Sequence, residues 1–406
     1  MRIVFVNLHT NEFLVKSASK YLFKQSIAIK HKYILDYLLN ETNIEVCSYI
    51  NKNGTSIAHN LPSLLMKILC AFRYMESKWV LKKNGIEHKI TILKKIDEIK
   101  RDDIIILHQL QAAYFPEMEQ VNSFKVMSLI HFFGSKSNSD AIKKSAPHLL
   151  MNEGDLKTHC ELFKKYYNWY DKEFLVFPFV FENRFQRTKP FKKRQNKVFS
   201  TGTITYRTHS EHLEIYGNSC LQPMRKYVKD HKEELQELID CYNSDYSENA
   251  NKKFSLTGHE NKCVRIIKSI YYKFFASQQK SYYSFNMVEK FNDYKMCLIG
   301  EEILSIPGIG FTEGMACGCA YIGRIGLYED YGMKAGIHYI GYNGTPEDLI
   351  AKIQYYQKPE HQNELEQIAE NGYQFAVNNF KGEIVAKRLI DELKIRQQEF
   401  LSNTNY

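Results

Sequence analysis

Short apolar runs alternate along this chain with longer segments in which apolar residues recur at helical spacing. In the first half the apolar runs occupy residues 3–8, 104–108, 126–133 and 174–179. In the second half they occupy residues 198–200, 296–299, 320–322 and 338–341. Buried runs of this length between amphipathic segments are typical of parallel strands joined by helices. The pattern therefore predicts an α/β fold with two doubly wound sheets.

Two prolines, Pro178 and Pro190, flank a break in this pattern, so we expect two domains that divide near residue 190. The expected domains are an N-terminal Rossmann-like domain at residues 1–190 and a second one at 191–380. Residues 363–399 have strong helical composition, which indicates that a C-terminal segment, 381–406, crosses back to the first domain. A chain of 406 residues can bury two cores of this kind.

Composition narrows the class of protein. The chain is 44% hydrophobic and 25% charged, and no apolar run approaches the about 18 residues that a spanning helix needs. The first apolar run is short and lacks a small-residue cleavage site, so it predicts a buried strand and not a signal peptide. The nine cysteines form no CxxC pair, which favours reduced thiols in the cytoplasm over disulfides or a zinc site. No metal is expected.

The net charge of +9 fits nucleic acid, an anionic membrane face or an acidic substrate. The densest basic run, 187–197, lies at the predicted domain link and has no nucleic-acid-binding motif beside it, so we interpret it as a solvated linker. Residues 61–83 mix apolar and basic side chains. This second stretch fits either an amphipathic core helix or a surface that rests on anionic lipid.

One stretch, Gly310 to Gly323, has the features of a nucleotide pocket. Gly308, Gly310 and Phe311 form a loop that can approach a ligand closely. Glu313 lies in the first turn of the following helix, where it can accept two ribose hydroxyls while free N–H groups meet phosphate. Gly314 keeps this helix slim against the next strand. The alternative is an ordinary helix-to-strand joint with a capping glutamate.

From about residue 197 to 380 the chain resembles the donor-binding half of a GT-B glycosyltransferase. The matching motifs are Lys197-Val-Phe-Ser-Thr-Gly-Thr203, the strand before Gly300, and Glu313-Gly-Met-Ala-Cys-Gly318. This resemblance implies two Rossmann-like domains with a cleft between them. Ser305 stands where many retaining members carry another glutamate, so Glu301 or Glu302 is expected to replace it. No Asp-x-Asp motif is present, and the resemblance implies no metal or other cofactor.

The leaving phosphate would then be stabilised by backbone N–H groups near Gly202 and Thr203 and by Arg207 and Arg225. A narrower resemblance is to the bacterial retaining beta-Kdo transferases, which use CMP-Kdo. It rests on Asn152-Glu153-Gly154, in place of an acid-acid-glycine triplet, and on Gln222-Pro223, in place of a His-Pro pair.

The narrower resemblance implies roles for the remaining candidate residues. Glu153 is the expected general base, with a helix N-cap as the alternative. Asp230 is the expected nucleophile, with a solvated helix position as the alternative. His259 would contact phosphate or protonate the leaving group. His131, Ser135 and Lys136 would bind an anionic sugar, although core packing is an alternative for the histidine.

The predicted function is metal-independent glycosyl transfer in lipopolysaccharide or capsule synthesis, with CMP-Kdo as the donor. The expected partners are a nucleotide-sugar and a glycan or lipid-linked glycan acceptor, at the inner face of the plasma membrane and without nucleic acid. A transferase that uses a UDP- or GDP-hexose is the first alternative. A nucleotide-sugar epimerase is disfavoured because no Gly-x-Gly-x-x-Gly follows the first strand. A non-catalytic basic protein at the membrane is the last alternative.

Overall fold

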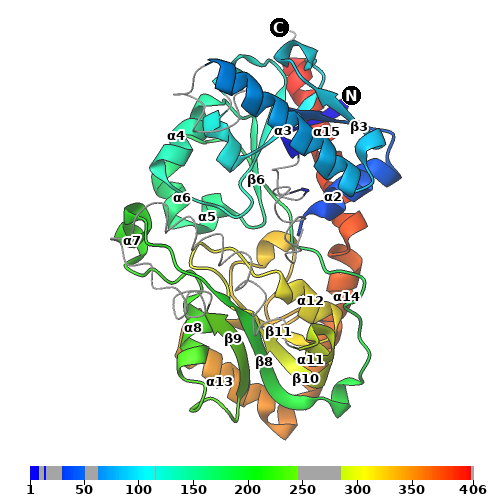
Figure 1. The fold of residues 1–406 in the computed structure, drawn as a ribbon. Helices are drawn as coiled ribbons and strands as arrows, with labels where there is room; N and C mark the ends of the chain where they lie inside the picture. Colours follow the sequence, from blue (N-terminus) through cyan, green and yellow to red (C-terminus); the bar gives the residue numbers. More distant parts are fainter. Residues whose placement is uncertain (9–12, 15–29, 51–62, 115, 246–284, 404–406) are drawn as a thin grey trace. The chain divides into compact units, whose positions relative to one another are not determined.

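The computed structural model describes residues 1–8, 13–14, 30–50, 63–114, 116–245 and 285–403. The chain forms two units (Figure 1). Unit 1 comprises Met1–Glu153, Glu161–Phe177 and Gly382–Tyr406, and unit 2 comprises Gly154–Cys160 and Pro178–Lys381. His259, a predicted phosphate contact, lies outside the described residues.

Unit 1 is built on a parallel sheet whose strand order is β3-β2-β1-β4-β5-β6-β7. Its strands are β1 (Arg2–Val6), β2 (Glu45–Tyr49), β3 (Ile90–Leu93), β4 (Ile104–His108), β5 (Phe124–Ser128), β6 (Leu149–Asn152) and β7 (Phe174–Val176). Its helices include α2 (Lys32–Glu41), α3 (Ser63–Lys83), α4 (Lys136–Lys144), α6 (Glu161–Tyr166) and α15 (Gly382–Asn403). The buried strands β1 and β4 form the centre of this sheet, as their apolar sequences predict.

The C-terminal helix α15 belongs to unit 1, where it packs against α2 (Figure 1). Its buried face carries Val385, Leu389 and Leu393, and α2 contributes Leu35 and Leu38. Apolar residues at spacings of three and four place these side chains on one side of each helix. The helix therefore buries its apolar stripe in unit 1 although it follows unit 2 in the chain.

Unit 2 has a second parallel sheet, in the order β12-β11-β10-β8-β9. Its strands are β8 (Gln195–Ile204), β9 (Ile239–Asp245), β10 (Tyr294–Leu298), β11 (Ala320–Arg324) and β12 (Ile340–Tyr342). Its helices include α5 (Leu156–His159), α7 (Ser210–Tyr216), α8 (Pro223–Asp230), α11 (Met287–Asp293), α12 (Gly310–Ala316), α13 (Pro346–Gln357) and α14 (Gln362–Asn379).

Helices cover both faces of this second sheet. On one face, Val198 packs in a core with residues of α8 and α13. The next residue, Phe199, points to the other face, where its ring lies 5.3 Å from that of Phe291 in α11. Successive residues of a strand alternate between faces, so a strand buried on both sides is apolar throughout. The predicted fold class, α/β with two Rossmann-like doubly wound units, is confirmed.

The units divide between Phe177 and Pro178, and not near residue 190. Residues after this point pack within unit 2, because Phe181 donates its backbone N–H to the Phe380 carbonyl at 3.4 Å and the ring of Phe185 lies 6.2 Å from that of Phe291. The division therefore falls at Pro178, the first of the two prolines, and residues 178–190 belong to unit 2. No helix among the described residues combines the length and apolar character that crossing a bilayer requires.

Candidate functional site

The strand order of unit 2 locates a binding position. The first strand of the unit, β8, lies between β9 and β10, so the chain winds in one direction from β8 to β9 and in the other from β10 onward. Open parallel sheets bind ligands at the carboxyl ends of the strands where this order reverses. The position is therefore the edge where β8 and β10 end, after Ile204 and Leu298.

Arg225 of α8 lies at this switch point. Its Nη1 donates to the Thr203 carbonyl at 2.8 Å, and its Nε donates to the carbonyls of Gly300, at 3.1 Å, and Ile299. The residue is only 8% exposed. Arg225 thus joins the carboxyl ends of β8 and β10 and places a positive charge between them, while its contact with a donor phosphate stays a prediction.

Three glycines surround the Arg225 side chain. A Cβ added to Gly202, Gly300 or Gly308 would lie 2.7, 2.9 or 2.6 Å from an Arg225 atom. Gly202 and Gly300 also have positive φ angles, of 152° and 59°. Gly308 is expected to approach a ligand closely and the backbone near Gly202 to donate to phosphate; in the structure both glycines also make room for the arginine.

Glu301 is buried and bound by several partners. It follows β10 at 6% exposure, and its carboxylate accepts hydrogen bonds from the Arg324 N–H at 2.8 Å, the Tyr328 hydroxyl at 2.8 Å and the Tyr342 hydroxyl at 3.1 Å. Burial and the Glu301 charge raise the pKa of both tyrosines, which stay neutral. This carboxylate therefore holds the segments after β10, in β11 and in β12 together, and the predicted sugar contact of Glu301 stays a prediction.

Glu302 belongs to a second, more exposed network. It accepts from Gln222 Nε2 at 3.2 Å, and Gln222 Oε1 in turn accepts from the Thr205 N–H at 2.8 Å. Burial lowers the pKa of Arg207, and the charge of Glu302 acts in the opposite direction. Gln222, expected in the place of a phosphate-binding histidine, instead ties the chain after β8 to the chain after β10.

Arg324 is a cation at this edge that the sequence analysis missed. It is the last residue of β11, and its Nη2 donates to Ser305 Oγ at 2.8 Å. Within the described residues no carboxylate forms an ion pair with it. The signal was its place two residues after the apolar run 320–322, just beyond the Gly310–Gly323 stretch. Ser305 itself has a φ of 62° and also donates to the His159 carbonyl at 2.9 Å.

The predicted helix after Gly308 is confirmed as α12, with Glu313 in its first turn. Gly314 packs against β10, since an added Cβ would lie 2.5 Å from the Cys297 sulfur. Gly310 packs in the same way against Ile299, at 2.9 Å. Phe311 is fully buried, with its ring stacked 5.9 Å from Tyr331, so it belongs to the core and not to a donor-binding loop. A ribose contact by Glu313 stays a prediction.

In unit 1 the structure brings Glu153 and His131 together with His31, which the sequence analysis missed. Glu153 follows β6, and its Oε1 lies 3.0 Å from His31 Nε2, with both residues at 0% exposure. His31 precedes α2 but makes no side-chain cap to it. The ring of His131 lies 6.5 Å from that of His31. These three residues, the imidazole–carboxylate cluster, lie within the unit that carries β4, β5 and β6.

Electrostatics keep the Glu153 carboxyl group ionised. Burial alone would raise its pKa, but the hydrogen bond and charge of His31 and the charge of His131 outweigh burial and lower it. His131 is the partly exposed member of the cluster and has a φ of 55°. Non-glycine residues with positive φ are uncommon, and strained backbone gathers at functional sites. The predicted N-cap alternative for Glu153 is wrong, because Asp155 caps α5.

Ser135 and Lys136 have local roles. Ser135 Oγ accepts from the Asn138 N–H at 3.1 Å and caps α4. Lys136 Nζ forms an ion pair with Asp140 at 2.7 Å, with the side chains 67% and 55% exposed. The expected anion-binding turn is thus the start of α4, where Lys136 faces solvent and pairs with Asp140 of the same helix.

Asp230, the expected nucleophile, lies at the end of α8. It pairs with Lys226 at 2.6 Å one helical turn earlier, and the side chains are 46% and 44% exposed. A carboxylate with this exposure, paired with a lysine of its own helix, is a solvated surface group. The placement matches the alternative of a solvated helix residue.

We expect Asp230→Asn to keep transfer activity close to that of the parent. The free energy of unfolding should change by less than about 0.5 kcal/mol, because exposed pairs one turn apart contribute about 0.3–0.5 kcal/mol. Activity assays and urea unfolding test this expectation. Loss of transfer by orders of magnitude with unchanged stability would restore the nucleophile assignment.

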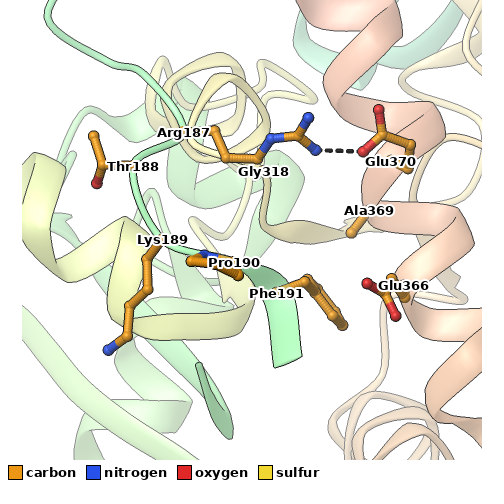
Figure 2. A pocket seen from close by; sticks show the side chains of 9 residues that line it. All are labelled: Arg187, Thr188, Lys189, Pro190, Phe191, Gly318, Glu366, Ala369 and Glu370. Atoms are coloured by element: carbon orange, nitrogen blue, oxygen red, sulfur yellow. Dashed lines mark hydrogen bonds and ion pairs between the residues drawn. The ribbon is translucent and has the colours of Figure 1, made fainter. Parts of the chain in front are cut away.

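A cavity of about 400 Å³ lies elsewhere in unit 2 (Figure 2). It is lined by Arg187, Thr188, Lys189, Pro190, Phe191, Gly318, Glu366, Ala369 and Glu370. Phe191 precedes β8 and Gly318 precedes β11, so the cavity opens at the amino edge of the sheet, opposite Arg225. Ion pairs join Arg187 to Glu370 and, at 3.1 Å, Lys189 to Asp293. The basic run is therefore packed on unit 2 and is not the solvated linker that we expected.

No protein-family model matches this chain, and neither does any curated protein. Solved structures do resemble it. HepE from Anabaena, in complex with UDP, is 10% identical at a TM-score of 0.49, and the match covers 97% of this chain and 99% of HepE. Sucrose-phosphate synthase from Thermosynechococcus elongatus is 9% identical at a TM-score of 0.48 over 99% of this chain and 100% of the synthase.

A glycosyltransferase from Rickettsia africae is 12% identical at a TM-score of 0.46, with 99% of each chain covered. These TM-scores all lie below 0.5. Similarity at this level shows the fold alone, so the roles of residues in this chain follow from their own contacts.

Proposed function

We propose that this chain is a glycosyltransferase that uses a nucleotide-sugar, with the donor at unit 2 and acceptor activation by unit 1. The observation that carries the proposal is Arg225, held at the β8/β10 switch point by carbonyls of both strand ends. A fixed guanidinium at this position stabilises negative charge that develops on a leaving phosphate. The resemblance of residues 197–380 to a GT-B donor half supports the same assignment.

Arg324 supplies a second cation on the neighbouring strand β11. Its guanidinium is held by the neutral Ser305 hydroxyl, so forming a bond to phosphate requires no ion pair to break within the described residues. Arg207, beyond the end of β8, is the third basic candidate. Glu313 is proposed to accept the ribose hydroxyls from the first turn of α12. In this arrangement the arginines contact the phosphate of the nucleotide, and the Glu313 carboxylate contacts its ribose hydroxyls.

In unit 1 we assign His131 as the base that takes the acceptor hydroxyl proton. Glu153 and His31 are assigned as positioning residues, because both are fully buried and bonded to each other. In the net reaction the acceptor oxygen bonds to the anomeric carbon, the bond from that carbon to the donor phosphate breaks, and the acceptor proton passes to the imidazole. The nucleotide leaves with the electron pair of the broken bond.

The donor class is proposed more broadly than CMP-Kdo. The CMP-Kdo prediction rested on the triplet 152–154 and on Gln222-Pro223, and it gave the nucleophile role to Asp230. Gln222 and Asp230 are both engaged in other contacts. A role in lipopolysaccharide or capsule synthesis depends on that donor and stays a prediction. CMP-Kdo remains one of the donors to be tested beside UDP- and GDP-sugars.

A melting-shift panel of CMP, CMP-Kdo, UDP, UDP-glucose and GDP tests the proposal on the full chain. We expect one nucleotide and its sugar to raise Tm, because a ligand at a hundred times its Kd adds about 2.7 kcal/mol to folded-state stability. Arg324→Gln should weaken that binding about 10- to 100-fold, the effect of losing one hydrogen bond to a charged group.

The matched control is Lys226→Gln, which removes an exposed cation paired with Asp230 on the helix that carries Arg225. Its Kd should equal that of the parent. The proposal is wrong if no nucleotide or nucleotide-sugar shifts Tm. If a nucleotide binds and Arg324→Gln leaves its Kd unchanged, the placement of the phosphate beside β11 is wrong.

A further inference from the structure

The described part of helix α3 has one buried and one exposed face. Ser77, Val80 and Leu81 are buried on the first. Phe72 and Met75 are each 66% exposed on the second, and they are the most exposed large hydrophobic side chains of the described residues. Spacings of three and four residues place Phe72, Met75 and the half-buried Trp79 along the same side of the helix. The helix therefore fills the core of unit 1 with one face and presents an apolar stripe on the other.

Lysines surround this stripe. Lys78, Lys82 and Lys83 of α3 are exposed, and Lys94 joins them from the segment after β3. Lys94 Nζ lies 4.7 Å from the centroid of the Tyr74 ring, and Lys78 Nζ lies 5.4 Å from the same ring. Lys83 Nζ lies 5.6 Å from the Trp79 ring. Glu76 is the acidic residue of α3 among these side chains, so the face is both apolar and basic.

We propose that this face, defined by Phe72, Met75, Trp79 and the four lysines, binds the surface of an anionic bilayer. Interfacial helices of this kind insert apolar and aromatic side chains at the headgroup level while lysines meet anionic headgroups. Long lysine side chains also lie along aromatic rings and keep their charge in water, as the Lys83 and Lys94 contacts allow. The exposed phenylalanine and methionine favour lipid over nucleic acid, since phosphate contacts need the lysines alone.

The proposal goes beyond glycosyl transfer and does not depend on it. Binding combines two contributions. One is an electrostatic attraction between lysines and anionic headgroups, which weakens as the salt concentration rises. The other is insertion of the Phe72 and Met75 side chains. The interaction would hold the protein at a membrane surface. Failure of membrane binding would leave the assignment of the donor and acceptor residues intact, because none of them lies on α3.

Co-sedimentation of the full chain with vesicles is the test. One set of vesicles contains phosphatidylcholine alone, and the other contains phosphatidylcholine and phosphatidylglycerol in equal parts. We expect binding to the anionic vesicles that decreases as salt rises, and little binding to the neutral ones. The double variant Phe72→Ser, Met75→Ser should bind at least about tenfold more weakly, because it loses two apolar side chains that become buried when they insert into the bilayer.

Ile395→Ser is the matched control, because Ile395 is 51% exposed on α15 of the same unit. It should bind as the parent does, and unchanged Tm values should show that all variants fold. Equal binding of the double variant and the parent would overturn the proposal, as would failure of the parent to bind anionic vesicles. A parent dimer that becomes monomeric in the double variant, without vesicle binding, would assign the face to a second copy instead.

Discussion

We expect His131→Asn to lower kcat for glycosyl transfer by about 10²- to 10⁴-fold, the range over which a positioned acid or base contributes to rate. His131 is the partly exposed member of the imidazole–carboxylate cluster, and its backbone φ of 55° is rare for a residue with a Cβ. Asparagine tolerates that backbone region better than most residues, so the variant removes the imidazole and keeps the loop. Steady-state kinetics and a melting curve measure the two effects separately.

The nucleotide-binding panel supplies the control for this variant. His131→Asn should bind the nucleotide with the Kd of the parent, because the donor contacts lie in unit 2. A kcat close to that of the parent would remove His131 from the chemistry. Equal losses of nucleotide affinity and of kcat would show a folding defect instead.

A second variant separates the positioning residues from the base. Glu153→Gln removes a carboxylate whose lowered pKa keeps it ionised beside His31 and His131. Loss of this negative charge disfavours the protonated form of the base His131, so the acidic limb of the kcat/KM profile should move to lower pH. A purely structural role for Glu153 would lower Tm without moving that limb.

The largest expected effect on stability is that of Glu301→Ala, which should lower the free energy of unfolding of unit 2 by about 3–4 kcal/mol. The carboxylate accepts from the Arg324 N–H and from the Tyr328 and Tyr342 hydroxyls at 2.8 to 3.1 Å. Each buried donor left without an acceptor costs about 1–3 kcal/mol. Urea unfolding followed by circular dichroism measures the change.

Glu302→Ala is the matched control, one residue away. Glu302 is only half-buried and accepts from Gln222 at 3.2 Å, so its removal should cost less than about 1 kcal/mol. Glu301→Gln should lie between the two, because an amide oxygen still accepts hydrogen bonds. A Glu301→Ala protein within about 0.5 kcal/mol of the parent would show that its three donors find other acceptors.

Apolar runs located most of the strands correctly, for a physical reason. The run at 104–108 coincides with β4, and the run at 320–322 lies inside β11, because central parallel strands are buried on both faces. β9 was missed because it is an edge strand whose sequence, Ile-Asp-Cys-Tyr-Asn-Ser-Asp, is half-exposed and polar. β2 was missed for the same compositional reason, since Glu45 and Ser48 interrupt its apolar residues.

The candidate site was less accessible to sequence reasoning. Glu301 was recognised as a carboxylate after a strand, but its partners Tyr328 and Tyr342 come from later segments. Arg225 is predicted from the sequence as a phosphate contact, and the structure places it at the switch point, with Gly202 and Gly308 packed against its side chain. His31 lies far from Glu153 in the chain, and no local pattern connects the two.

The sequence by itself determined that this chain forms two parallel α/β units, and it indicated that α12 starts beside Glu313. Both follow from local patterns, namely the spacing of apolar residues and the residue types at a helix start, and these patterns can be read from a few consecutive residues. Only the tertiary structure decided which polar groups are consumed by the fold and which stay at an edge. Glu301 is consumed by tyrosines from later segments and Arg225 by carbonyls at two strand ends, whereas Arg324 stays at the end of β11 with its guanidinium on a serine hydroxyl. That difference depends on contacts between distant segments, and a list of residue types does not contain them.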